Sequence, residues 1–166
     1  MAHGCASQSM TIVTAYDTLG SSGVEHSLNQ TKAVAMYLDP HLIKTATEPL
    51  KKAESVKTVI YNDISIFPAG DAVEVLKKAR PDLTIISFEE LRALGEENPV
   101  PEVTASPEDT FCIMYTSGST GLPKGAVMSH GALVAGGKHY SNFPLILYLH
   151  LHFLSFSPSR RPDILR

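Results

Sequence analysis

The residue types best suited to chemistry gather in one short stretch, Tyr115–Gly125, which reads YTSGSTGLPKG. Its glycines permit positive φ, which lets several backbone N–H groups point toward one anion. Its Ser and Thr hydroxyls add donors that can also face a metal ion. Lys124 adds a positive charge, and Pro123 stiffens the turn that presents it. These groups predict a loop that binds the phosphates of a triphosphate.

Two other interpretations of this loop are weaker. A Walker A loop requires GxxxxGK followed by Ser or Thr, whereas here Lys124 precedes a glycine and Pro123 stands five residues after Gly118. A plain Ser/Gly turn needs neither a buried strand before it nor a Pro-Lys-Gly ending. The sequence on both sides of the loop therefore favours a phosphate-binding loop.

Three further candidates are less specific. Cys112 lies within the apolar run Phe111–Tyr115, where a thiol more often packs in a core than acts as a nucleophile. His150 and His152 could be two metal ligands on one strand face, but no Cys, Asp or Glu lies close by, so we interpret the pair as incidental. His130 follows an expected strand near the loop, and the sequence leaves open a supporting role there or a surface position at a helix start.

The composition is that of one globular domain with a buried core, since 43% of the 166 residues are hydrophobic and 19% are charged. The formal net charge of -3, without a basic cluster, argues against binding to nucleic acid or to a membrane surface. Its two cysteines lack CxxC spacing, which fits a reducing compartment. The first residues lack the charged and apolar segments of a signal peptide, so we expect a cytoplasmic location.

Short apolar runs rich in β-branched residues alternate with stretches in which apolar residues recur at helical spacing. The expected strands are Thr11–Tyr16, Ala33–Leu38, Val56–Tyr61, Leu83–Ile86 and Thr110–Tyr115. The expected helices are Ser22–Gln30, Pro40–Ala53 with Asp39 as its cap, Asp71–Ala79 and Phe88–Leu94. This alternation predicts an α/β fold with a doubly wound, mostly parallel sheet, which binds ligands at the carboxyl ends of its strands.

The stretch Tyr115–Gly125 closely resembles the phosphate-binding signature of the adenylate-forming, or AMP-binding, enzyme superfamily. A second stretch, Val13–Gly20 (VTAYDTLG), resembles the corresponding segment of the long-chain acyl-CoA ligases. Alone, Asp17–Gly20 would be a plain strand-to-helix turn with an acidic cap. Together, the two matches narrow the resemblance to the long-chain fatty acid–CoA ligases, over about residues 2–136.

The resemblance implies ATP-dependent activation of a long-chain fatty acid through an acyl-adenylate, with Mg²⁺ and with coenzyme A as co-substrate. Protein catalysis in such a reaction is largely positioning and charge stabilisation. Thr116 would approach Mg²⁺, and Lys124 would be the catalytic residue that stabilises the leaving pyrophosphate. The implied phosphate-binding residues are Thr116, Ser117, Gly118, Ser119, Thr120, Gly121 and Lys124.

The resemblance also implies a partial sheet from the large N-terminal domain of such an enzyme. The family's later aromatic-Gly-x-Thr-Glu segment, its ribose-binding acid, its hinge and the lysine of its C-terminal lid are not found in the sequence. We therefore expect a partial AMP-binding domain over residues 1–136, a poorly ordered tail outside the family pattern over residues 137–166, and weak or no activity for this chain.

Membrane attachment is expected only through parts of the protein that are not in this chain. The apolar run Phe143–Phe156 is shorter than the roughly 20 residues that a membrane-spanning helix needs. Full-length relatives often lie on the cytosolic face of the endoplasmic reticulum or of other membranes. The expected partners are small molecules, namely ATP, a fatty acid and coenzyme A.

Two alternative functions stay open at this stage. One is another adenylate-forming ligase that acts on an aryl or short-chain acid, although Tyr16–Gly20 argues against it. The other is a non-catalytic nucleotide-binding remnant. A substrate panel separates the first alternative from a long-chain ligase, and thermal unfolding with and without Mg-ATP separates the second from an unfolded fragment.

Overall fold

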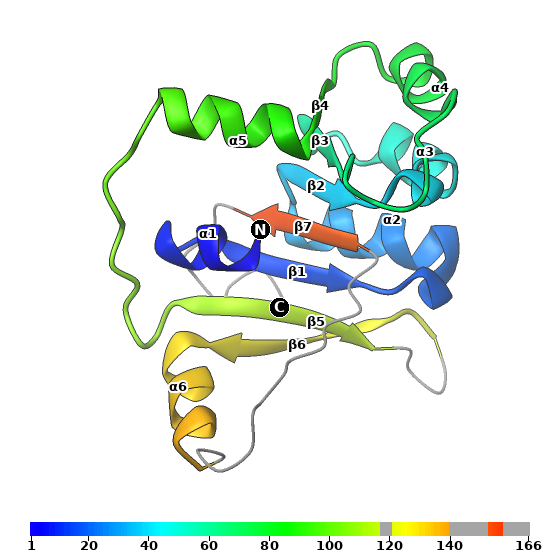
Figure 1. Ribbon diagram of the computed structural model, residues 1–166. Helices are drawn as coiled ribbons and strands as arrows, with labels where there is room; N and C mark the ends of the chain where they lie inside the picture. The colour runs from blue at the N-terminus through cyan, green and yellow to red at the C-terminus, as the bar shows by residue number, and fades with distance from the viewer. Residues whose placement is uncertain (117–120, 140–152, 158–166) are drawn as a thin grey trace.

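The computed structural model describes residues 1–116, 121–139 and 153–157 of the chain, which form a sheet flanked by helices (Figure 1). In chain order the helices and strands are α1 (Ala2–Ser7), β1 (Thr11–Ala15), α2 (Gly20–Thr31), β2 (Ala35–Leu38), α3 (Ile43–Lys52), β3 (Thr58–Tyr61), α4 (Ala72–Ala79), β4 (Thr84–Ser87), α5 (Phe88–Glu97), β5 (Thr110–Thr116), β6 (Lys124–Ser129), α6 (His130–His139) and β7 (Phe153–Ser157). Two 3₁₀ turns, η1 (Asp17–Leu19) and η2 (Pro40–Leu42), precede α2 and α3.

The strands form one sheet in the order β4-β3-β2-β7-β1-β5-β6. The pairs β2–β3, β3–β4 and β1–β5 are parallel. The strand β6 is antiparallel to β5, and β7 is antiparallel to both of its neighbours. Because β7 is antiparallel to both β1 and β2, the five strands β1 to β5 all run in the same direction. The mostly parallel α/β sheet predicted from the sequence is therefore confirmed.

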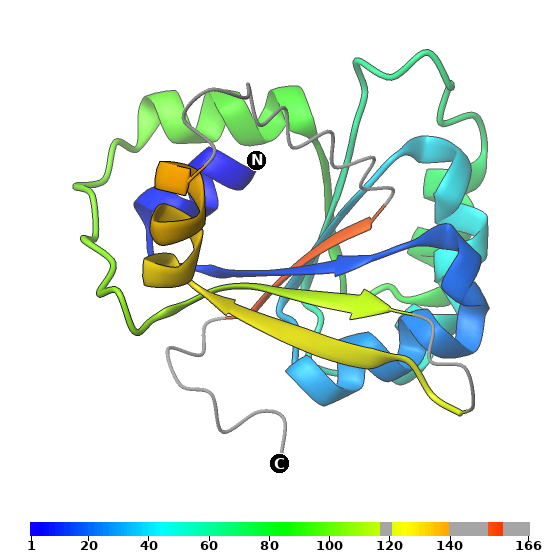
Figure 2. The same cartoon turned by 90° about the horizontal axis from the view of Figure 1, so that it is seen from below.

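Helices cover both faces of this sheet, as Figure 2 shows: α2 and α3 lie on one side, and α1, α5 and α6 lie on the other. Two hydrophobic clusters correspond to these two faces. One contains Leu28 of α2, Leu50 of α3 and Leu76 of α4. The other gathers Cys5 of α1 and Leu91 of α5 around Ile12 and Cys112 of the sheet. Burial on both faces explains why a strand such as β5 carries apolar residues on both of its faces.

All five predicted strands are present, and each predicted helix overlaps an observed one. One detail of the prediction is wrong. Asp39 was expected to cap the helix that begins at Pro40, but its side chain makes no capping hydrogen bond, and the first turn is a 3₁₀ turn. The Asp39 carboxylate instead accepts a hydrogen bond of 2.8 Å from Nδ2 of Asn62, because the carboxyl ends of β2 and β3 lie side by side in the sheet.

The strand β7 lies in the middle of the sheet, although it comes from the last part of the chain. Its backbone pairs with β1 from Thr11↔Ser157 to Ala15↔Phe153 and with β2 from Ala35↔Phe156 to Leu38↔Phe153. The helix α6 also continues across position 136. The division of the chain into a family domain over residues 1–136 and a tail over residues 137–166 stays a prediction.

Candidate functional site

The predicted phosphate loop connects two paired strands, β5 and β6. Tyr115 lies opposite Gly125 in the antiparallel ladder, and Thr116 lies opposite Lys124. The ladder thus brings the first and last residues of the predicted site to the same point. The four residues between them at the tip, Ser117, Gly118, Ser119 and Thr120, lie outside the described residues.

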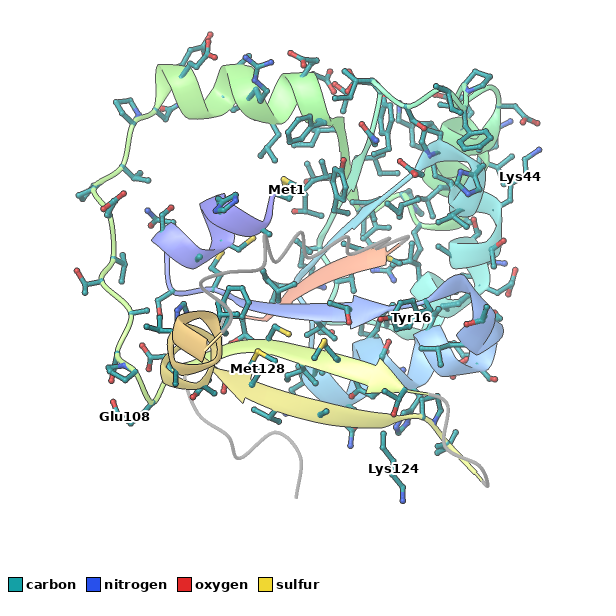
Figure 3. All side chains as sticks on the ribbon, turned by 60° about the horizontal axis from the view of Figure 1, so that its bottom comes forward. Met1, Tyr16, Lys44, Glu108, Lys124 and Met128 are labelled. Atoms are coloured by element: carbon teal, nitrogen blue, oxygen red, sulfur yellow. The ribbon has the colours of Figure 1, made fainter. Side chains whose placement is uncertain are left out.

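The described site residues are accessible to a ligand. Thr116, Gly121 and Lys124 are all exposed. Figure 3 shows the Lys124 side chain extending away from the ribbon, so its ammonium group is free to meet an anion from solvent. Gly121 has a φ of +108°, a conformation that a side chain would disfavour, which explains the glycine at this point of the turn.

The loop is supported from below by Tyr115, which is 0% exposed. Side chains alternate along a strand, so Tyr115 faces the interior while its neighbour Thr116 faces solvent. A Cβ placed on Gly125 would lie 3.2 Å from Cζ of Tyr115 and 2.8 Å from Cγ2 of Ile113. Gly125 therefore lets the tyrosine ring pass beneath the end of the loop.

The helix α2 forms the other support of the loop, and sequence reasoning missed its contribution. The Tyr115 hydroxyl donates a hydrogen bond of 2.5 Å to Oε1 of Gln30. The ring of His26 meets the Tyr115 ring edge-on, with centroids 6.1 Å apart. Gly23 approaches Pro123, since a Cβ placed on Gly23 would lie 3.2 Å from Cγ of the proline. The only sequence signal was a glycine in the first turns of an expected helix, which normally disfavours helix formation.

The two stretches that carried the resemblance lie next to each other. The strand β1 leads into Tyr16 and β5 leads into Thr116, and these strands are parallel neighbours in register from Ile12↔Cys112 to Thr14↔Met114. Their carboxyl ends therefore meet at one edge of the sheet, where such folds bind ligands. Tyr16 is partly exposed there, and Gly20 begins α2 with a φ of +66°.

A magnesium ion bound with a nucleotide would find one suitable oxygen donor among the described site residues. Mg²⁺ usually keeps several waters and takes few protein ligands besides phosphate oxygens. The exposed hydroxyl of Thr116 at the mouth of the loop fits that requirement. Among the described residues there is no group of three or more His, Cys, Asp or Glu side chains placed to hold a metal ion by themselves.

The cysteines are unsuited to nucleophilic chemistry. Burial raises the pKa of the Cys112 thiol to about 11, and it raises the pKa of Cys5 to about 11 as well. Both thiols are therefore protonated near neutral pH, when only the thiolate is an effective nucleophile. This supports the interpretation of Cys112 as a core residue.

His130 is separate from the loop. His130 begins α6 at the far end of β6, and Ser129 pairs with Thr110, so His130 lies roughly 17–20 Å along the strand from Lys124. Figure 3 places Glu108, beside the start of β5, and Lys124 at opposite ends of this strand pair. The supporting role left open for His130 is therefore wrong: its ring packs edge-on against Phe111, with centroids 5.2 Å apart. His150 and His152 lie outside the described residues.

Comparison with known proteins gives consistent results. The sequence profile described as AMP-binding enzyme matches residues 1–159. Over 136 residues, or 82% of this chain, the sequence is 48% identical to palmitoyl-CoA ligase FUM16 of Gibberella moniliformis, covering 20% of that protein. Over 135 residues, or 81% of the chain, it is 47% identical to long-chain-fatty-acid–CoA ligase 1 of Schizosaccharomyces pombe, covering 19% of that protein.

Solved structures share the fold. The adenylation domain of a carboxylate reductase from Mycobacterium chelonae superposes with a TM-score of 0.65 at 24% identity, over 75% of this chain and 20% of that one. The chain spans about a fifth of the length of the curated relatives that it matches. The sheet and its flanking helices are thus an arrangement that also occurs in solved adenylation domains.

Proposed function

This chain belongs to the AMP-binding enzyme family, and we propose that it supplies the pyrophosphate-binding loop of a ligase that converts long-chain fatty acids to acyl-CoA. The observation that carries the proposal is the loop itself: Thr116 and Lys124 meet across a strand ladder at the carboxyl edge of the sheet, and both are exposed. The names of the relatives support the substrate class, since they are palmitoyl-CoA and long-chain-fatty-acid–CoA ligases.

The proposed reaction has two steps. A carboxylate oxygen of the fatty acid attacks the α-phosphorus of ATP, an O–P bond forms, and the bond to the bridging oxygen breaks as pyrophosphate leaves with the electron pair. The sulfur of coenzyme A then loses its proton and attacks the acyl carbon, so that a thioester forms and AMP leaves. Neither step requires a covalent bond to this chain, so its residues act by positioning and charge.

Each site residue has a definite part in this proposal. Backbone N–H groups from Ser117 to Gly121 and the nearby hydroxyls hold the β- and γ-phosphates. The Lys124 ammonium balances the negative charge that develops on pyrophosphate as it leaves. Mg²⁺, when bound with ATP, neutralises phosphate charge, and Thr116 is the residue that we assign to it. Two of the glycines with positive φ, Gly20 and Gly121, lie at this edge of the sheet.

Binding by this chain is tested by titrating it with Mg-ATP in a calorimeter. We expect Lys124→Glu to weaken Mg-ATP binding by at least tenfold, because it reverses a charge that faces the phosphates. Lys78→Glu is the matched control, since Lys78 is an exposed lysine of α4, away from the loop. Equal binding of Mg-ATP by the wild type and by Lys124→Glu would remove the basis of the proposal.

Ligase activity is tested in a chimera, because the chain spans about a fifth of its relatives. The 136 matched residues replace their counterpart in the Gibberella palmitoyl-CoA ligase, and ATP–pyrophosphate exchange is measured with palmitate. We expect exchange from the chimera and little or none from this chain alone. A chimera that folds but supports no exchange would favour the alternative function, a non-catalytic nucleotide-binding remnant.

The acid that is activated is settled by a substrate panel in the same chimera. We expect long-chain acids to be used far better than benzoate or acetate, and the reverse order would favour an aryl or short-chain ligase.

We also propose a cytoplasmic location, with any membrane association made by other parts of the protein. Within the described part of the chain, no helix is both long enough and apolar enough to cross a bilayer.

A further inference from the structure

Tyr115 is held on three sides directly beneath the phosphate loop. Its ring lies under Gly125, its edge faces His26, and its hydroxyl donates a hydrogen bond of 2.5 Å to Gln30. Gln30 lies 85 residues earlier in the chain, in the last turn of α2. A single side chain therefore joins β5, β6 and α2 at one point.

The position of this junction matters for the loop. Tyr115 directly precedes Thr116, and Gly125, which lies opposite it, directly follows Lys124. Any shift of the tyrosine ring is passed through one peptide unit to each of the two site residues. Catalysis by charge stabilisation depends on such placement, because a displacement of about 1 Å can cost about a hundredfold in rate.

Packing of the ring alone does not explain why residue 115 is a tyrosine rather than a phenylalanine. A phenylalanine would fill the same buried space, while a buried hydroxyl must find a hydrogen-bond partner. The partner, Gln30, is only partly buried, so its side chain could turn to solvent if the hydroxyl were absent. The hydroxyl therefore adds a link between β5 and α2 that the packing of the ring does not provide.

We propose that Tyr115 is a positioning residue for the adenylation step and that its hydrogen bond to Gln30 holds the phosphate loop in register with α2. This inference rests on the proposed function, and it adds two residues of this chain, Tyr115 and Gln30, to that site. Neither residue touches the nucleotide. They act through the backbone of Thr116 and Lys124.

The test uses the chimera with the Gibberella ligase, in which Tyr115→Phe and Gln30→Leu each break the bond without creating a cavity. We expect each to raise KM for Mg-ATP about tenfold, the size of effect given by the loss of one partly buried hydrogen bond, and to leave KM for palmitate unchanged. The double variant is expected to be no worse than either single variant, because both remove the same bond. Gln30→Glu keeps an acceptor oxygen and is expected to restore KM for Mg-ATP to within twofold.

The control is Tyr37→Phe, the same chemical change on β2, where the ring packs against Phe88 away from the loop. A purely structural role for Tyr115 would lower the melting temperature and the active fraction without separating the two KM values. Unchanged KM for Mg-ATP in both Tyr115→Phe and Gln30→Leu, or equal shifts in both KM values, overturns the inference. If the wild-type chimera itself fails to exchange pyrophosphate, the proposed function has failed instead.

Discussion

Gly23 of α2 and Pro123 of the phosphate loop approach each other so closely that a Cβ on the glycine would lie 3.2 Å from Cγ of the proline. The same Cβ would lie 2.8 Å from Cβ of Leu19, in the turn that leads into α2. Gly23, which follows the first of the two stretches that resemble the ligase family, thus lies between Leu19 of that stretch and Pro123 of the second. Gly23 is a requirement of this contact, because an L side chain has no space there.

Gly23→Ala should therefore disturb the contact between α2 and the loop. The matched control is Gly95→Ala in α5, where a Cβ would meet nothing within 4 Å. Both changes remove the unfavourable effect of a helical glycine, so their difference isolates the steric clash. We expect Gly23→Ala to be less stable than Gly95→Ala by about 1–3 kcal/mol in urea unfolding. Equal stabilities would mean that Leu19 and Pro123 yield without cost.

The titration of Tyr115 should report its burial. Burial raises the pKa of this phenol from its ordinary value of 10.0 to about 12. A raised pKa means that the folded state keeps a proton that the unfolded state loses, so this contribution to stability is present below pH 10 and lost as pH rises through about 12. When the absorbance of tyrosinate near 295 nm is followed as pH rises, the wild type should show one ionisation at high pH that Tyr115→Phe lacks. An unchanged titration curve would contradict this.

Arg80 should contribute more to the free energy of unfolding than the exposed Arg92 does. Its side chain is 11% exposed, and its guanidinium donates to the carbonyls of Leu50 and Val56 and to Asp82. Arg80→Met leaves these carbonyls without a donor and should cost about 1–3 kcal/mol. Arg92→Met removes only exposed pairs within α5 and should cost less than about 1 kcal/mol. Urea unfolding of both variants gives the comparison.

The stability difference between the wild type and Arg80→Met should depend on pH at the acid end of the range. The hydrogen bond from Arg80 lowers the pKa of the Asp82 carboxyl from 3.8 to about 2. A lowered pKa contributes stability above pH 3.8 that is lost as pH falls through about 2. The stability difference between the wild type and Arg80→Met should therefore shrink over that interval. A difference that stays constant down to pH 2 would show that the ion pair contributes nothing.

Removing residues 140–166 should expose the middle of the sheet. This truncation deletes β7, whose backbone pairs with β1 on one side and with β2 on the other. Both strands would then present unpaired N–H and C=O groups, which are costly when buried and prone to intermolecular pairing. We expect a lower melting temperature or a shift toward oligomers on gel filtration. A monomer with the original melting temperature would show that β7 adds nothing to the fold.

Much of the architecture could be predicted from local patterns. Runs such as Thr110–Tyr115 are short and carry apolar residues on both faces, a pattern typical of strands buried in a sheet. The chemistry of the loop could also be predicted, because its glycines, hydroxyls and lysine lie within one short stretch of the sequence. The role of Asp39 could not be predicted. Its carboxylate accepts a hydrogen bond from Asn62 instead of capping the helix, and only the sheet brings these two residues together.

What the sequence alone determined is the chemistry of the loop and the alternation of strands and helices, since both depend on residues adjacent in the chain. The tertiary structure decided which residues support that loop. Tyr115 meets Gln30, Gly23 meets Pro123, and His130 is carried to the far end of β6. These relations join positions that only the packing of α2 against the sheet brings together, and no periodicity in the sequence records such a contact.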